Sequence, residues 1–342
     1  MVLLPASMSL IRETYPDAVA RARALGIWAV GGAIAGTVGP PLGGVLATFD
    51  WRLVFAISVP PCALILLLLL LVQVHRSPVR PARFDGIGQT LAIIALVALV
   101  GSLIEGGALR YSDPHILGGF AVAILAGTAF VLSQRRTASP MMPLEIFRPP
   151  QVRLALALGF AFMVSNFGTS FLVSLYLQQH LGLDPLHAGL LFLISSAFSI
   201  AGNLLSGHAT NRFGPRFPVL VGMSALGVGA LAIAAVAPVA PVGAPALMTA
   251  ILVLTGFGGA FAMPPTSGLV LAAVPQQLAG TASAVFNTFR QIGGAVAIAV
   301  FAALVAEPAR FVSGMQASMI ATAVLVLAVI IAASRTGLPR KA

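Results

Sequence analysis

Stretches of about 20 apolar residues recur along nearly the whole chain. The hydrocarbon core of a bilayer is about 30 Å thick and an α-helix rises about 1.5 Å per residue, so each stretch is long enough to cross a membrane as a helix. Because lipid offers backbone groups no hydrogen-bond partners, the expected fold is all-α and polytopic. We expect about ten full spans, near residues 23–47, 52–74, 87–109, 115–133, 153–177, 187–209, 217–237, 245–272, 279–305 and 314–334.

The composition excludes a water-soluble fold. Of the 342 residues, 58% are hydrophobic and 8% are charged, and the mean hydropathy is +1.01. Soluble domains carry roughly 25% charged residues, so this chain has too few to coat its surface. The single cysteine, Cys62, lies in an apolar run and allows neither a disulfide framework nor a cysteine metal site. We therefore expect no metal and no cofactor.

The basic residues predict an orientation in the membrane. A net charge of +10 would suit nucleic acid only if the basic residues were clustered on one face, but here they are scattered between apolar runs. Loops rich in Lys and Arg are retained in the cytoplasm. Fifteen of the 19 Lys and Arg residues fall in every second loop, counted from the first loop. They are Arg12, Arg21, Arg23, Arg76, Arg80, Arg83, Arg135, Arg136, Arg148, Arg153, Arg212, Arg216, Arg335, Arg340 and Lys341. This pattern predicts a multi-pass protein of the inner or plasma membrane with a cytoplasmic C-terminus and no nucleic-acid partner.

Two long loops rich in Pro and Arg, near 75–85 and 134–152, divide the chain into three parts. We expect residues 1–80 to be the end of one group of helices, residues 81–136 to be a two-helix insert, and residues 137–342 to hold six helices and a tail. The first residues, MVLLPASMSLI, are apolar but about half as long as a span requires. A signal peptide would need a basic start and a cleavage site, so the end of a longer helix is the better interpretation.

The glycine-rich run GIWAVGGAIAGTVGPPLGG extends from Gly26 to Gly44. Its glycines recur at three- and four-residue spacing, so they share one helix face and allow a neighbouring backbone to approach closely. Pro40 is expected to bend the helix, because proline removes a backbone donor. On spacing alone, an ordinary packing face explains the run equally well.

The run resembles the antiporter motif of drug/proton antiporters in the major facilitator superfamily. Residues Gly26, Gly39, Pro40, Gly43 and Gly44 fit that motif, whereas Ala35 stands where the family has glycine. The string GHATNRFGPR is similar to the cytoplasmic-loop signature of the superfamily. The matching positions are Gly207, Asn211, Arg212, Gly214 and Arg216, with Asn211 in place of the family's aspartate.

The string FNTFRQIGGAVAIAV, from Phe286, resembles the penultimate helix of the fourteen-helix branch, the EmrB/QacA type. The resemblance implies a partial major facilitator fold of about ten full spans plus a half span, with the two-helix insert between two halves. It also implies that the chain is truncated at its N-terminus and that the first fragment is the fourth helix. The function it implies is proton-coupled efflux of drugs or other amphipathic molecules by alternating access.

Arg290 is the most unusual polar residue in a predicted span. A charge at the centre of a spanning helix costs about 2.5–3.5 kcal/mol by insertion scales, so we expect Arg290 to face the interior or the cytoplasmic edge. Asn287 and Gln291 share its helix face by their spacing. An arginine that snorkels to the headgroups is the alternative. Glu105, near the external end of its span, is a candidate for proton relay.

Asn166 and Asn203 lie at mid-span depth and are further candidates for lining a substrate pathway. Hydrogen bonding between helices would explain both asparagines as well. The pair Pro264 and Pro265 predicts a bent or broken helix in the span 245–272.

Three functions remain open from the sequence. The first is a secondary transporter whose partners are a small-molecule substrate, protons and the lipid bilayer; a periplasmic adaptor is left open. The others are an exporter of one specific metabolite and an inactive fragment of such a transporter. A membrane-embedded enzyme is disfavoured because the chain has no HExxH motif and no paired aspartates within its spans, so we expect no enzyme.

Overall fold

The computed structural model describes residues 42–71, 85–109, 111–137, 139–239, 244–275 and 278–336, together with a few single positions between 17 and 39. Gly26, Pro40 and most of the first expected span therefore lie outside the described residues, as do the first eleven residues of the chain.

The described part is entirely helical apart from turns and short connections, and eight of its helical segments are long and apolar enough to cross a membrane. Their helices are α5 (Gly86–Leu109), α6 (Pro114–Arg136), α7 (Pro150–Leu175), α8 (Pro185–Phe213), α9 (Arg216–Val236), α10 (Ala244–Ala272), α11 (Ala279–Leu304) and α12 (Phe311–Arg335). A 3-10 turn, η1 (Leu144–Phe147), precedes α7, a π-helical turn, η2 (Tyr176–His180), extends it, and a 3-10 turn, η4 (Pro308–Arg310), precedes α12. The expected membrane-spanning class is confirmed.

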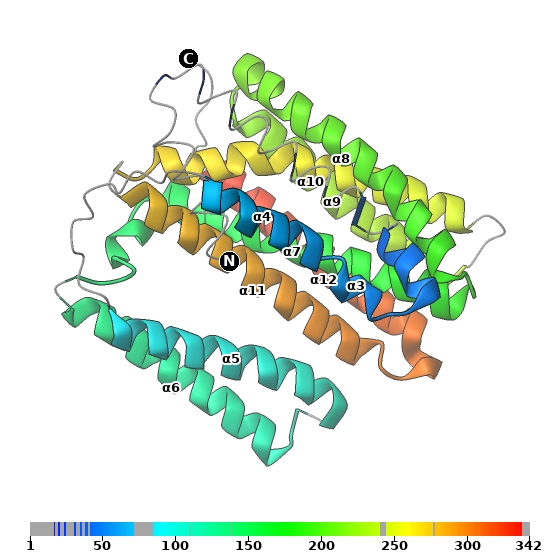
Figure 1. Cartoon of the computed structure of the whole chain (residues 1–342), viewed down its shortest axis with the longest axis horizontal. Helices are drawn as coiled ribbons and strands as arrows, with labels where there is room; N and C mark the ends of the chain where they lie inside the picture. Colours follow the sequence, from blue (N-terminus) through cyan, green and yellow to red (C-terminus); the bar gives the residue numbers. More distant parts are fainter. Residues whose placement is uncertain are drawn as a thin grey trace.

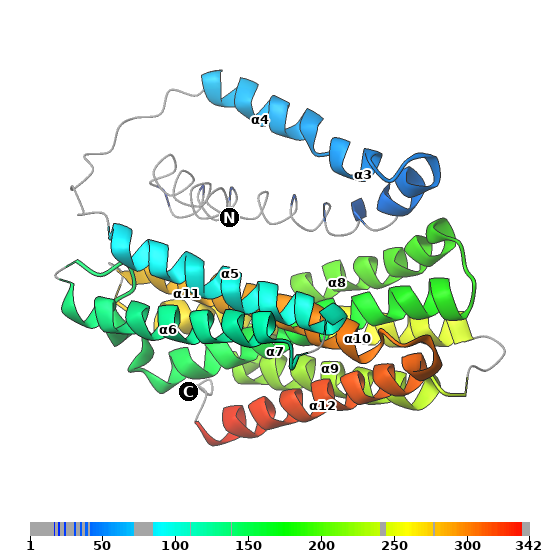
Figure 2. The same cartoon turned by 90° about the horizontal axis from the view of Figure 1, so that it is seen from below.

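The expected span 52–74 is divided in the structure. It forms α3 (Leu53–Ala56) and α4 (Val59–Leu71), which are separated by a turn at Ile57 and Ser58. Pro60 and Pro61 follow the turn and have no N–H to donate to the carbonyls four residues earlier, which favours a helix break at this point. The described side chains of α3 and α4 are exposed, and Figure 2 shows α4 set apart from the other helices.

The six helices α7 to α12 form one bundle with their axes roughly side by side (Figures 1 and 2). The main pairs within it are α7 with α11, α8 with α10, α9 with α10 and α9 with α12. Helices α5 and α6 form a hairpin that packs on this bundle through α5 and α11. Arg216 donates to the Ser334 carbonyl at 3.5 Å, so the start of α9 and the end of α12 lie at the same end of the bundle.

Glycines set the distance between several of these helices. A Cβ added at Gly202 of α8 would lie 2.6 Å from the Phe257 carbonyl oxygen of α10, and one added at Gly222 of α9 would strike the backbone of Gly258. Small residues at such positions let helix backbones approach closely, which is the main source of attraction between helices in lipid. The bundle is therefore held by backbone proximity.

Helix α10 runs unbroken from Ala244 to Ala272 through Pro264 and Pro265, so of the two predicted forms, a bent or a broken helix, the broken one is excluded. Pro265 cannot donate to the Phe261 carbonyl, which would otherwise lack a partner in lipid. The Ser206 hydroxyl of α8 donates to that carbonyl at 2.7 Å. A hydroxyl from the neighbouring helix thus replaces the hydrogen bond that the proline removes.

A polar cluster joins the α5–α6 hairpin to the segment that leads into α7. Asp85 precedes α5, and its carboxylate accepts hydrogen bonds from Gln134 Nε2 at 2.6 Å and from the Met141 backbone N–H at 3.3 Å. Gln134 in turn accepts from the Met142 N–H at 2.8 Å. The hydrogen bond from Gln134, the largest of the causes, lowers the pKa of Asp85 below its ordinary value of 3.8.

We predict that Ser206→Ala destabilises the bundle, because it leaves the Phe261 carbonyl without a partner. Hydrogen bonds between helices in membranes are worth about 0.6 kcal/mol on average and up to about 1.7 kcal/mol. Thermal unfolding of the purified chain in one detergent measures the loss. Ser267→Ala is the matched control, because the Ser267 hydroxyl bonds to Pro264 within its own helix. Equal unfolding temperatures for the two variants would contradict the role given to Ser206.

The Asp85 cluster predicts a pH-dependent contribution to stability. Because folding lowers the pKa of Asp85, the cluster stabilises the fold at every pH above 3.8 and loses that contribution as the pH falls through the folded value. Asp85→Asn should therefore lower the unfolding temperature at neutral pH, and its difference from the wild type should shrink below pH 3.8. Glu145→Gln, at an exposed carboxylate, is the control. A difference that stays constant with pH would exclude this mechanism.

Candidate functional site

Arg290 lies near the middle of a spanning helix. It is eleven residues after Ala279, the first residue of α11, and therefore about 17 Å along the helix axis. That distance is roughly half of a 30 Å hydrocarbon core, so the headgroups are far from the α-carbon on either side. The residue is partly buried, and α11 packs most closely against α7. This depth and burial favour an Arg290 that faces the interior of the bundle over one whose side chain snorkels to the headgroups from a helix end.

Two phenyl rings flank the guanidinium of Arg290. Its central carbon lies 5.8 Å from the ring centroid of Phe162 on α7 and 5.7 Å from that of Phe286 on α11. A cation at this distance from a ring centroid is attracted by the ring quadrupole, by about 0.5–2 kcal/mol. Gly159 makes room for this group, since a Cβ there would lie 2.6 Å from Phe286 and 3.0 Å from Cγ of Arg290.

The guanidinium is incompletely paired. Its Nη1 donates to the Asn287 side-chain oxygen at 3.2 Å, while the buried Nε has no hydrogen-bond partner. Every ion pair found in the described part of the chain lies at a turn or a helix end, and none includes Arg290. The site therefore holds a cation at mid-depth whose neighbours are two aromatic rings and one amide.

The other pathway candidates lie at different distances from this cation. Asn287 is its neighbour, and Gln291 follows it on an exposed position of α11. Asn166 lies seven residues beyond Gly159 on α7, about 10 Å further along the helix. The structure thus pairs Asn287 with Arg290, while Gln291 is next to Arg290 in the chain and Asn166 lies further along the bundle.

Two candidates are not part of this group. Asn203 is exposed on α8, a helix that has no substantial contact with α11. Glu105 is exposed near the end of α5, where Gly107 packs on Ala303 of α11. Since Ala303 is 13 residues from Arg290, or about 20 Å along the helix, Glu105 cannot pair with the cation.

The loop between α8 and α9 contains the residues that resemble a superfamily signature. Gly214 ends α8 with a φ of 80°, a backbone conformation that glycine adopts without strain. Gly207, Asn211 and Arg212 are exposed on the last turns of α8. Arg216 contacts the end of α12, as described above. These positions form a tight connection at one end of the bundle.

The described glycines of the antiporter-like run differ in their surroundings. Residues 42–49 are helical, and Gly44 is buried there, where an added Cβ would lie 2.9 Å from the Pro185 carbonyl oxygen at the start of α8. No heavy atom of the described residues lies within 4 Å of a Cβ built on Gly39 or Gly43. Close approach to a neighbouring helix is therefore observed at Gly44 among these three.

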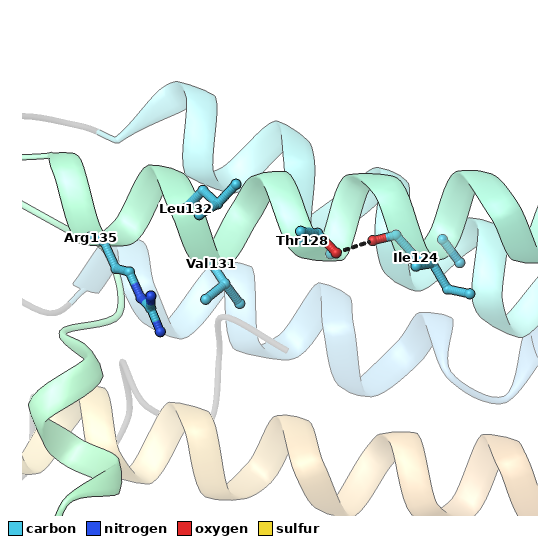
Figure 3. A pocket seen from close by; sticks show the side chains of 7 residues that line it. Ile124, Thr128, Val131, Leu132 and Arg135 are labelled. Carbon is cyan, nitrogen blue, oxygen red and sulfur yellow. Dashed lines mark hydrogen bonds between the residues drawn. The ribbon is translucent and has the colours of Figure 1, made fainter.

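A shallow hollow of about 530 Å³ runs along one face of α6 (Figure 3). Its lining residues are Ala123, Ile124, Gly127, Thr128, Val131, Leu132 and Arg135, all from this one helix. The Thr128 hydroxyl donates to the Ile124 carbonyl at 2.7 Å, so this donor is already used. The hollow is an open surface feature of α6 and shares no residue with the surroundings of Arg290.

The fold and this buried polar group define an all-helical, polytopic membrane protein. The sequence profile described as Major Facilitator Superfamily matches residues 2–298. The chain belongs to this superfamily.

Curated relatives with similar sequences are bacterial proteins named for drug resistance, efflux or export. The multidrug resistance protein Stp of Mycobacterium tuberculosis is 33% identical over 301 residues, which cover 88% of this chain and 55% of the relative. The drug efflux pump JefA of the same species is 32% identical over 312 residues, 88% of this chain and 59% of the relative. The tetracenomycin C resistance and export protein of Streptomyces glaucescens is 32% identical over 311 residues, 90% of this chain and 56% of the relative. The chain therefore spans a little over half the length of these relatives.

Sequence reasoning did not identify Phe162 or Gly159 as neighbours of Arg290. Both belong to α7, and their proximity depends on the pairing of α7 with α11, which hydropathy does not encode. Phe286 stands four residues before Arg290, so the helical spacing alone could have placed this ring beside the cation.

We predict that Gly44→Val destabilises the chain, because the added methyl groups would meet the backbone of α8. Forcing extra carbons into a packed contact typically costs about 1–3 kcal/mol. Gly43→Val is the matched control, since a Cβ on Gly43 meets no described atom within 4 Å. Thermal unfolding of both variants in the same detergent provides the measurement. A larger loss for Gly43→Val would contradict the contact.

Proposed function

We propose that the chain belongs to a proton-coupled exporter of drugs or other amphipathic small molecules. The observation that carries this proposal is the family match over residues 2–298, together with relatives named for multidrug resistance and drug efflux. Transport would proceed by rocking of two groups of helices about a site near the middle of the membrane. The mid-depth position of Arg290, Asn287 and Gln291 supports a site on α11.

We further propose the layout of the fourteen-helix branch. In this layout, residues 81–136 contain the two-helix insert, and residues 1–80 and 137–342 belong to the two six-helix groups. The separate α5–α6 hairpin and the bundle α7 to α12 support this division. The alternating basic loops support a cytoplasmic C-terminus.

The roles of individual residues are also proposals. Asn166 remains a candidate for the pathway because it is partly buried on α7, the helix that pairs with α11. Asn203 and Glu105 are exposed, which favours contact with lipid or water over contact with Arg290. Coupling to protons, and any adaptor protein, rest on the family resemblance.

A narrower exporter of one metabolite is the second candidate. It is favoured by the similarity to a relative named as a tetracenomycin C resistance and export protein. The two functions predict different responses to a panel of unrelated compounds.

We predict that expressing the chain in a bacterial host that lacks its own efflux pumps lowers the accumulation of several unrelated fluorescent lipophilic drugs. Dissipating the proton gradient with a protonophore should abolish the difference, because the gradient would supply the energy. Accumulation is measured by cell fluorescence, with an empty vector as the control. Lower accumulation of a single compound would favour the metabolite exporter, and unchanged accumulation of every compound would refute drug export by this chain.

A further inference from the structure

Two buried side-chain atoms without a hydrogen-bond partner lie on the same helix pair. Across the described residues, the buried and unpaired atoms are Nε of Arg290 on α11 and the hydroxyl oxygen of Ser165 on α7. Ser165 follows Phe162 by three residues, so both lie on the same side of α7. Ser165 therefore lies on the same side of α7 as Phe162, one of the two rings that flank the guanidinium.

A permanent cation in this position is costly. A charged side chain at the centre of a spanning helix costs several kcal/mol unless it is paired, and an arginine cannot lose its proton to relieve this cost. The two rings and Asn287 offset part of it, but neither ring supplies a negative charge. A bound anion would complete the pairing, since a guanidinium presents a fork of donors that fits a planar oxyanion.

We propose that Arg290 binds the acidic group of a transported molecule, so that the preferred substrates are amphipathic anions. The acidic group would be a carboxylate, sulfonate or phosphate. This inference rests on the proposed function, because it names the class of molecule that the exporter carries. The inference goes beyond the proposed function because it assigns a preference for anionic substrates to one side chain, Arg290.

A lipid headgroup has the same anionic chemistry and is the alternative source of the ligand. The position of Arg290, about 17 Å along α11, places the guanidinium well below the headgroups and favours a solute that enters the bundle. The experiment separates the two sources.

Two fluorescent probes that differ only in one acidic group provide the test. Anilinonaphthalene sulfonate is an anion, and N-phenylnaphthylamine is the same aromatic skeleton without the sulfonate. Both become brighter in apolar surroundings. Their affinities are measured for the 342-residue chain in phosphatidylcholine nanodiscs, after subtraction of the signal of empty nanodiscs.

We expect Arg290→Gln to weaken binding of the sulfonate by at least about tenfold, the factor that corresponds to about 1.4 kcal/mol, and to change binding of the neutral probe by less than about twofold. Arg153→Gln is the matched control, because it removes the same charge from an exposed position at the start of α7. Arg290→Lys keeps the positive charge but loses the fork of donors, so it should weaken binding of the sulfonate probe by a smaller factor than Arg290→Gln. This variant decides the question if Arg290→Gln does not fold.

The proposal is overturned if both probes lose affinity by the same factor in both Arg290 variants, which would make Arg290 a structural clamp between α7 and α11. It is also overturned if the wild-type preference disappears in phosphatidylglycerol nanodiscs, which would assign the site to lipid headgroups. Failure of the proposed function is recognised separately, by unchanged drug accumulation in cells. An unchanged accumulation with a preserved sulfonate preference would refute export while retaining the anion site.

Discussion

Every backbone N–H and C=O group inside the bilayer has to find its hydrogen-bond partner within the protein, and the described structure follows from this requirement. It explains why the spans are helices and how α10 accommodates Pro265. At Pro265 the helix loses a donor, and Ser206 of α8 provides a replacement for the Phe261 carbonyl. The requirement thus links α8 to α10 at the position where the α10 backbone is weakest.

The same requirement shapes how the helices pack. Once the backbone is satisfied within each helix, association in lipid depends on close contact and not on the hydrophobic effect. Gly202, Gly222 and Gly44 each bring a neighbouring backbone within the reach of a single methyl group. Gly159 has a different role, because it admits the side chains of Phe286 and Arg290 beside α7. Glycine positions therefore determine both the helix spacing and the room for a buried cation.

Eight of the ten expected spans match long apolar helices of the described residues, because apolar length is a direct consequence of membrane thickness. The expected spans 245–272 and 279–305 differ from α10 and α11 by one residue at most at either end. The depth of Arg290 followed from its place in such a span. The partners of Arg290 did not, since Phe162 is 128 residues away and reaches it only through the pairing of two non-adjacent helices. The division of the span near Pro60 was also missed, because prolines are common in transmembrane helices.

Arg290 is a residue that lowers the stability of the fold, unlike the hydrogen-bonded groups around it. Phe162, Phe286 and Asn287 hold the guanidinium in place, yet its Nε stays buried without an acceptor. An unmade hydrogen bond of this kind costs about 1–3 kcal/mol, and more for a charged group. A leucine at this position would pack against the two rings without that cost. In a bundle that satisfies even the carbonyl left open by a proline, one unsatisfied cation at mid-depth is most simply explained by a partner that the substrate supplies.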